Sequence, residues 1–283
     1  MLSTRAAVRR SPGGRRLGAF ALHLALGLGA LAMILPLIWM LSTSFRLPKD
    51  LYVPELFPPQ ATLANYWHVL LATAFPHWFL NSLLVAGVTT ASVVFFDSLT
   101  GYALAKFDFP GRRLVFIGIL STLMVPTELL VIPWYMMSRT LGWTDTYWGI
   151  MFPGLMTGFG VFLMRQFFQS VPNELLDAAR IDGLSEFGVF RRIALPLVRP
   201  ALAALGILTF LGNWNAYLWP LIVINSPAMQ TLPVGVSIFS TEAGAEYQYI
   251  MAAASLATVP VIAVFILFQR QIIRGIALTG IKA

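Results

Sequence analysis

The chain has 283 residues, of which 58% are hydrophobic and 11% are charged, with a net charge of +7 and no cysteine. A soluble domain averages about half apolar and about a quarter charged residues, so this composition excludes an ordinary soluble protein. The abundance of large apolar residues also excludes disorder. The lack of cysteine excludes disulfides, thiolate metal sites and cysteine nucleophiles. A polytopic membrane protein remains.

Six apolar segments follow one another along the chain, each long enough to cross a hydrocarbon core of about 30 Å as a helix. The first follows a basic leader, but its apolar run exceeds the ~7–15 residues of a signal peptide, so we expect an uncleaved helix. We therefore predict an all-α polytopic membrane protein with six transmembrane helices. These are predicted at residues 18–41, 78–99, 114–137, 147–168, 201–224 and 250–268.

Lys and Arg residues are distributed unequally between the two sides of these segments. If the N-terminus is cytoplasmic, 16 of the 19 fall in inner segments, and only Arg46, Lys49 and Arg139 fall outside. The positive-inside rule then places both termini in the cytoplasm, in a multi-pass protein of the cytoplasmic (inner) membrane. The predicted parts are a tail (1–17), a first helix (18–41), an outer loop (42–77), a core (78–268) with an inner loop (169–199) and an outer loop (225–249), and a tail (269–283).

Two acidic residues fall within predicted spans. Glu128 follows Arg113 by about 22 Å along a continuous helix, which places it inside the membrane toward the outer side. A charge at a helix centre costs roughly 2.5–3.5 kcal/mol, so Glu128 should face a cavity or a partner group. A role in the pathway and a structural hydrogen bond or protonated side chain both stay open. Asp97 lies near the cytoplasmic end of its helix, where we expect an interfacial charge.

The inner loop has the pattern of two short helices. Pro172 and Asn173 suit the start of the first helix, and Gly183 suits its end in a left-handed conformation. Ser185 then suits the cap of a second helix. The pattern predicts a helical elbow at the cytoplasmic membrane surface, in which Ala178 and Ala179 leave a low patch for a partner protein.

This loop resembles the EAA motif of binding-protein-dependent ABC importer permeases. Asp177-Ala178-Ala179, three further residues, Gly183, nine further residues and Ile193-x-Leu195-Pro196 match its spacing, with Asp177 where the motif's name has Glu. In that family the loop is a coupling helix that sits in a cleft of a cytoplasmic ATPase. The resemblance implies an ATPase-docking surface that comprises Glu174, Asp177, Ala178, Ala179, Asp182, Gly183, Ile193, Leu195 and Pro196.

The resemblance extends to the carbohydrate-type branch of the family, most closely to the maltose-permease G-type subunit and its glycerol-3-phosphate counterpart. The segments Met124-Val125-Pro126 and Trp214-Asn215-Ala216-Tyr217 are among those that carry it. It implies a second homologous permease subunit, two copies of a cytoplasmic ATPase and an extracytoplasmic solute-binding protein that touches the loop 225–249. ATP and Mg would be bound by the ATPase, so we expect no cofactor, metal, catalytic residue or nucleic acid on this chain.

Polar and aromatic residues crowd the fifth apolar segment. Amides and aromatic faces commonly recognise sugars, which makes these residues candidates for a translocation path, while helix packing with polar contacts is the alternative. The sequence leaves open whether the solute is a monosaccharide, an oligosaccharide, a polyol or glycerol-3-phosphate. The candidate path residues are Glu128, Asn213, Trp214, Asn215, Tyr217 and Trp219.

Two other functions stay open on the sequence. An ion-coupled secondary transporter would use Glu128 and Asp97 as coupling sites, but it leaves the elbow unexplained, and the inverted repeats common in such folds are not apparent. A membrane scaffold would transport nothing. A requirement of uptake for ATP or for an ion gradient distinguishes the first alternative from an ABC importer.

Overall fold

The structure is a computed structural model, and it describes residues 12–51, 53, 55–239 and 246–280. Within these residues every regular element is a helix, which confirms the all-α fold. Three helices include stretches long and apolar enough to cross a membrane alone, and the number rises to six if each of three bent helix pairs forms one span. The three are α1 (Pro12–Ser44), α3 (Phe75–Lys106) and α14 (Tyr247–Gly280).

The third apolar segment is broken in the middle. Helices α4 (Arg112–Thr122) and α5 (Val131–Thr140) replace the single helix predicted over residues 114–137, with the short helix η2 (Thr127–Leu130) between them. The two halves are bent by 92°. Pro126 accounts for the break, because a proline has no amide hydrogen to donate and disfavours helical geometry at the residue before it. The prediction of one continuous helix here was wrong.

The fourth and fifth segments are broken as well. In the fourth, α6 (Tyr147–Met151) and η3 (Phe152–Gly154) meet α7 (Gly158–Gln169) at a bend of 43°. In the fifth, α11 (Arg199–Trp214) ends before α12 (Leu218–Val223) begins. The breaks expose backbone groups that a continuous helix would pair, so side chains must satisfy them at membrane depth.

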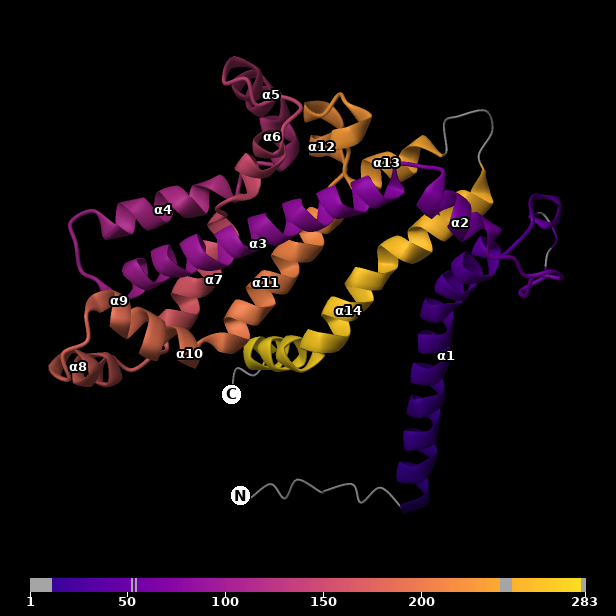
Figure 1. The fold of residues 1–283 in the computed structure, drawn as a ribbon. Coiled ribbons are helices and arrows are strands. Elements are labelled where there is room, and N and C mark those ends of the chain that lie inside the picture. The colour runs from indigo at the N-terminus through magenta and orange to yellow at the C-terminus, as the bar shows by residue number, and fades with distance from the viewer. Residues whose placement is uncertain (1–11, 52, 54, 240–245, 281–283) are drawn as a thin grey trace.

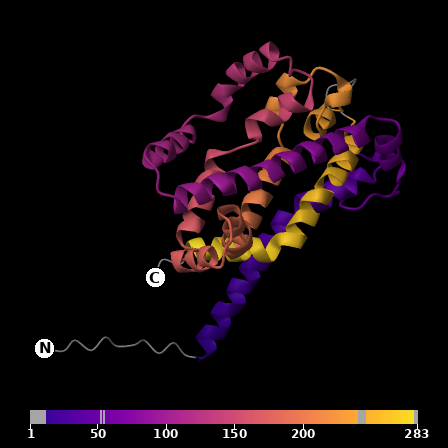
Figure 2. The ribbon, with the colours of Figure 1, turned by 60° about the vertical axis from the view of Figure 1, so that its left-hand side comes forward.

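Helix α3 lies at the centre of the fold, with α7 and α11 packed against it (Figures 1 and 2). The main buried cluster brings together Tyr102 from α3, Phe168 from α7 and Leu205 from α11. A glycine permits the closest approach, because a Cβ atom added at Gly101 would lie 2.8 Å from the backbone nitrogen of Arg165. This packing sets α3 and α7 in a fixed relation, on which the candidate site depends.

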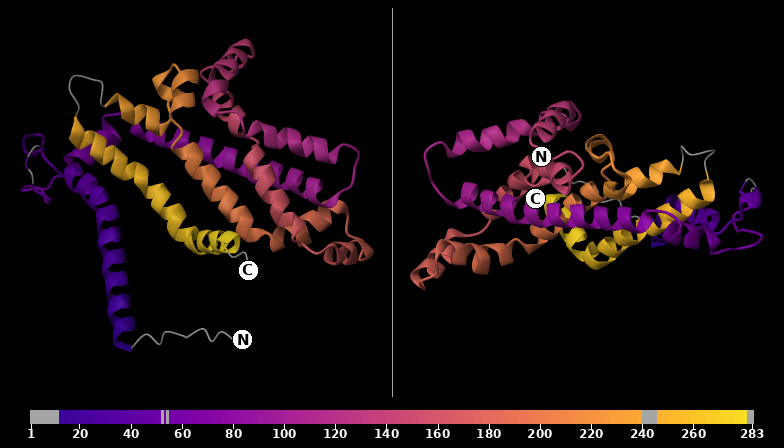
Figure 3. Two further views of the ribbon diagram at one scale, coloured as in Figure 1. Left: turned by 180° about the vertical axis from the view of Figure 1, so that it is seen from behind. Right: turned by 45° about the horizontal axis from the view of Figure 1, so that its top comes forward.

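Helix α1 projects away from the rest of the molecule and contacts α14 only near the C-terminal end of α1 (Figure 3). Its apolar side chains are largely exposed, Met33 to 81% and Phe20 to 66%. Such a continuous apolar surface is typical of a face that contacts lipid or another subunit. The helix begins at Pro12 and α14 continues to Gly280, so part of each predicted cytoplasmic tail is helical.

Short helices occupy the two predicted outer loops, of which residues 52, 54 and 240–245 lie outside the described part. The first loop is held by Arg46, which is fully buried and donates from Nη1 to the Val53 carbonyl at 2.6 Å. The short helices are η1 (Pro48–Asp50), α2 (Ala64–Leu71), η5 (Pro227–Met229) and α13 (Leu232–Ile238). The start of α1 and the end of α14 lie toward the other end of the molecule (Figure 1).

Candidate functional site

The inner loop folds into the expected helical elbow. It consists of α8 (Asn173–Ile181), a turn at Gly183 with φ of +85°, α9 (Glu186–Val189) and a π-helical stretch (Phe190–Ala194) that leads to α10 (Leu195–Leu197). The positive φ at Gly183 confirms the left-handed turn expected there, a conformation that glycine adopts at little cost. The elbow lies at the end of the molecule where α14 ends (Figure 1).

Ser185 caps the second helix as expected. Its hydroxyl accepts a hydrogen bond from the amide of Gly188 at 3.2 Å. Three residues spaced three apart along this segment differ in burial, because Phe190 is buried and Ile193 half-buried, whereas Phe187 is 53% exposed.

The two faces of α8 differ sharply. Leu176 and Ala179 are buried in the main cluster, whereas the opposite face is exposed. Ala179 therefore does not contribute to the low patch predicted for it, because its side chain points toward the protein interior. The predicted docking residues that are exposed are Glu174, Asp177, Ala178, Asp182 and Gly183, and those that are half-buried are Ile193, Leu195 and Pro196.

Arg180 joins the two arms of the elbow. Its Nη1 donates to Asp177 at 2.6 Å, and its Nε and Nη2 donate to the two carboxylate oxygens of Glu186 at 2.8 and 3.1 Å. The hydrogen bond that Arg180 donates to Glu186, followed by that to Asp177, raises the pKa of Arg180 further above its already high value. Such a bidentate contact fixes an angle as well as a distance, so it holds α8 and α9 in one arrangement across the Gly183 turn.

The elbow is attached to the C-terminal end of α3. Lys106 Nζ donates to the Val171 carbonyl at 2.5 Å and to Asn173 Oδ1 at 2.8 Å. The buried ring of Tyr102 lies 5.3 Å from that of Phe168 and 5.2 Å from that of Phe190. Displacement of the elbow must therefore act on α3.

Asp97 is not the interfacial charge that the sequence predicted. It is fully buried between α3 and α7, and its carboxylate accepts hydrogen bonds from the amide and hydroxyl of Thr157. Thr157 in turn accepts from the amide of Gly160. The pair satisfies amides at the broken start of α7, which explains a carboxylate at this depth without a role in ion coupling.

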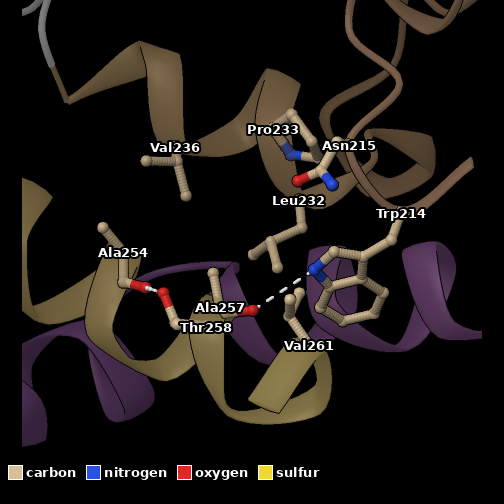
Figure 4. A pocket seen from close by; sticks show the side chains of 9 residues that line it. All are labelled: Trp214, Asn215, Leu232, Pro233, Val236, Ala254, Ala257, Thr258 and Val261. Carbon is tan, nitrogen blue, oxygen red and sulfur yellow. Dashed lines mark hydrogen bonds between the residues drawn. The ribbon is translucent and has the colours of Figure 1, made fainter. Parts of the chain in front are cut away.

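Three candidate path residues lie at the end of α11. The Trp214 ring is buried and donates from Nε1 to the Ala257 carbonyl of α14 at 3.2 Å. Asn213 and Asn215 donate to the carbonyls four residues before them. Trp214 and Asn215 line a pocket of about 380 Å³ between α11, α13 and α14, walled otherwise mostly by apolar side chains (Figure 4).

The remaining three path candidates lie elsewhere. Trp219 of α12 donates to the carbonyls of Gly149 and Ile150, and Tyr217 just before α12 is 43% exposed. Glu128 is exposed on η2, at the bend between α4 and α5. The six residues are thus not gathered in one cavity of this chain, and their role in translocation stays a prediction.

Asp145 was not predicted, and it connects the turn after α5 to the segment after α12. One oxygen of its carboxylate accepts hydrogen bonds from the amides of Asn225 and Ser226 and from the Ser226 hydroxyl. The amide of Ser226 is the largest of the causes that hold the pKa of Asp145 below its ordinary value. The backbone of Asp145 has a φ of +60°, which is uncommon outside glycine and is tolerated better by aspartate than by most residues.

Several functional contacts escaped the sequence analysis because they join residues far apart in the chain. The pairs Asp97–Thr157, Lys106–Asn173 and Asp145–Ser226 span 60 to 81 residues. Only the Asp177–Arg180 pair carries a sequence signal, since residues three apart lie on one helix face.

Comparisons with known proteins agree on one family. Residues 98–278 match the family model described as "Binding-protein-dependent transport system inner membrane component". The chain is 38% identical to an arabinooligosaccharides transport system permease protein of Halalkalibacterium halodurans, over 89% of this chain and 92% of that protein. It is 34% identical to an sn-glycerol-3-phosphate transport system permease protein of Agrobacterium fabrum, over 91% and 95%.

Among solved structures, a chain of a bacterial ABC transporter involved in the import of the acidic polysaccharide alginate has a similar fold. The TM-score is 0.81 at 24% sequence identity, and the match covers 93% of this chain and 99% of that chain.

Proposed function

Because this chain belongs to the family of binding-protein-dependent transport system inner membrane components, we propose that it is a permease subunit of an ATP-driven importer that forms half of a translocation pore. The observation that carries the proposal is the elbow, which holds Glu174, Asp177 and Asp182 exposed beside a left-handed Gly183. The chain itself is not an enzyme, and ATP with its Mg ion is bound by a partner ATPase.

The elbow supports a specific means of coupling. Two copies of the ATPase close around ATP, and the cleft of one copy carries the elbow with it. Arg180 keeps the two arms of the elbow together, and Lys106 and Tyr102 pass the displacement to α3. Because α3 packs tightly against α7 and α11, these helices move with it, and the pore changes its facing.

The solute proposed is a sugar or a sugar-like compound. Relatives are named for arabinooligosaccharides, lactose and glycerol-3-phosphate, so an oligosaccharide, a monosaccharide, a polyol or glycerol-3-phosphate all fit. A second homologous permease subunit completes the pore, and an extracytoplasmic binding protein delivers the solute, in part through the loop 225–249. The candidate contacts from this chain are Glu128, Asn213, Trp214, Asn215, Tyr217 and Trp219.

The proposed topology has six spans in the cytoplasmic membrane with both termini inside. Ala228 is exposed on η5 at the outer end, and Gln169 is exposed at the end of α7 beside the elbow. Because the chain has no native cysteine, single cysteines report their side cleanly. Ala228→Cys should react with an impermeant maleimide in intact cells, and Gln169→Cys only after permeabilisation.

Reconstitution tests the function. The complex of this chain, the second permease, the ATPase and the binding protein should take up labelled oligosaccharide into proteoliposomes only when ATP is inside. A proton or sodium gradient should not replace ATP. Uptake driven by the gradient alone would favour the ion-coupled alternative, for which Glu128 is the remaining acidic candidate now that Asp97 is engaged with Thr157.

A further inference from the structure

A pocket with three arginines opens between α4 and α7 at the end of the molecule that carries the elbow. Its volume is about 430 Å³. Two of the arginines begin α4, directly after the turn from α3, and the third lies near the end of α7. The lining residues are Arg112, Arg113, Phe116, Ile117, Leu120 and Arg165.

The arginine on α7 is held in place but keeps free donors. The Arg165 guanidinium stacks over the ring of Phe116, 3.9 Å from its centroid, and its Nε donates to the Leu104 carbonyl at 3.3 Å. No acceptor among the described residues binds its two Nη groups. Arg165 thus presents a pre-oriented planar fork, the geometry that suits the oxygens of a phosphate.

Positive charge in the pocket is not balanced by the protein. Arg112 pairs with Asp108 at 2.6 Å, but that carboxylate is 92% exposed, and surface pairs of this kind contribute little. Arg113 has no ion pair within the described residues. The site therefore attracts an anion from outside this chain.

The other wall of the pocket is apolar and continues along an exposed helix. No residue of α4 is buried, and Leu114 and Ile117 are 75% and 47% exposed. Ile117 and Leu120 lie about 6 and about 10 Å along the helix from Arg113, in the direction of the membrane interior. A free anion would use only the arginines, whereas a ligand with a charged head and a hydrocarbon chain would use both walls.

We propose that this pocket binds an anionic phospholipid of the cytoplasmic leaflet, with its phosphate at Arg113 and Arg165 and an acyl chain along Ile117 and Leu120. The inner leaflet is the anionic one, and basic pockets between membrane helices on that side bind such headgroups. The inference rests on the cytoplasmic placement of this end, proposed above, but not on transport or its solute. The lipid would fasten the loosely packed α4 to α7, the helix that leads into the elbow.

Lipid retention by the purified complex tests the proposal. The intact complex is exchanged into phosphatidylcholine with or without phosphatidylglycerol, and retained lipid is counted by native mass spectrometry. Arg113→Gln should lower phosphatidylglycerol retention about tenfold, equivalent to ~1.4 kcal/mol. Arg113→Lys should keep much of the phosphatidylglycerol retention. Arg192 is an exposed arginine of the elbow outside the pocket, and Arg192→Gln should change the retention little.

Arg165→Gln also removes the stacking on Phe116, so Arg165→Lys serves beside it to separate lost charge from lost packing. Inorganic phosphate is added to a parallel sample, and it should not protect the complex against heat as short-chain phosphatidylglycerol does. Equal protection by phosphate would identify a free-anion site and overturn the lipid proposal.

Two other results would also overturn it. Equal losses in Arg113→Gln and Arg192→Gln would indicate diffuse attraction to the membrane. Unchanged retention, with cross-linking of Ile117→Cys to the second permease, would show that a protein covers the pocket. Because lipid is counted without turnover, failure of uptake in every lipid mixture would count against the proposed function and leave this test intact.

Discussion

The carboxylate of Asp97 on α3 and the hydroxyl of Thr157 at the start of α7 form a hydrogen bond of 2.7 Å inside the helix core. The same carboxylate accepts from the Thr157 amide, and the Cβ of any residue larger than glycine at position 160 would lie 2.1 Å from Asp97 Oδ2. An acidic side chain thus replaces the backbone acceptor that the break before α7 removes. The start of α7 is thus fixed by α3 as well as by its own cap, Thr157.

Asp97→Leu should destabilise the folded subunit. It leaves the Thr157 amide and hydroxyl without acceptors, and an unsatisfied buried donor costs about 1–3 kcal/mol. Asp97→Asn keeps one acceptor oxygen and should lose less. Thermal unfolding of the purified complex and its yield by fluorescence size exclusion measure both changes.

A glycine pair provides the control for this contact. Gly160→Ala on α7 should lower the yield strongly through its clash with Asp97. Gly87→Ala on α3 should be neutral, because a Cβ atom there meets nothing within 4 Å. Equal stability of the two alanine variants would contradict the close packing of α3 and α7 at Asp97.

Lys106→Met should uncouple ATP hydrolysis from uptake. The change keeps the length of the side chain but removes its donors to the Val171 carbonyl and to Asn173. We expect ATPase activity stimulated by the binding protein to persist and solute uptake per ATP to fall several-fold, because the elbow no longer moves α3 with it. Both are measured in proteoliposomes.

The exposed Lys49 of η1 supplies the matched control, and Lys49→Met should leave the ratio of uptake to hydrolysis unchanged. Lys106→Arg, which retains a donor, should be intermediate. A wild-type ratio in Lys106→Met would mean that the elbow acts on the pore by another route.

Local patterns predicted the elbow well, because Pro172, Gly183 and Ser185 are neighbours whose roles depend on nearby backbone alone. The apolar runs likewise predicted where apolar helices lie. They did not predict the breaks within the third, fourth and fifth segments, since hydrophobicity continues across a break and Pro126 alone does not identify one. The length of an apolar run therefore indicates the length of a helical segment, but not whether that segment is broken.

Partners distant in sequence were beyond prediction. Asp97 looked like an interfacial charge because its depth was estimated from its own helix, and nothing local indicates that Thr157 lies beside it. Trp214 and Trp219 are candidate sugar contacts by residue type, and nothing local indicates that their indole groups donate to distant backbone carbonyls. Residue type indicates what a side chain can bind, whereas packing decides what it meets.

The contacts of Asp145 lead us to expect a loss of stability in acid. Its pKa is lowered on folding by hydrogen bonds from Ser226 and Asn225, so the ionised form stabilises the native state at neutral pH. This contribution is complete above the unfolded pKa of about 4 and is lost as the pH falls through the lower folded pKa. Above that range, the melting temperature of wild type should exceed that of Asp145→Asn by a constant amount. The two melting temperatures should converge on acidification.

Ser226→Ala removes one of the three hydrogen bonds to Asp145 and should give a smaller difference with the same dependence on pH. A gap between wild type and Asp145→Asn that is independent of pH throughout would show that the carboxylate acts by its shape alone.

Arg180 and Glu186 should be energetically coupled across the elbow. Removal of either partner breaks the bidentate contact, so a double-mutant cycle with Arg180→Ala and Glu186→Ala should show non-additive losses of uptake. Both groups are partly exposed, so the effect on stability should be small and the effect on uptake larger. Additive losses would indicate that the two residues meet the ATPase independently.

Gly183→Val should abolish uptake while the subunit still folds and inserts. A Cβ at Gly183 meets nothing within 4 Å, so the cost within this chain comes from the φ of +85°, about 1–2 kcal/mol for an L-residue and more with β-branching. The added side chain projects from the exposed surface that we propose docks on the ATPase. Uptake and ATPase stimulation in proteoliposomes should both be lost, and Gly183→Asn, which tolerates this conformation better, should keep part of each.

Gly142 provides the matched position for this experiment. It has a φ of +69°, an added Cβ there also meets nothing within 4 Å, and it lies in the turn after α5 at the opposite end. Gly142→Val therefore carries a similar backbone cost without touching the elbow, and it should retain most uptake. If the two valine variants lose uptake to the same extent, the loss reflects backbone strain in general. That result would contradict the prediction that the elbow docks on the ATPase.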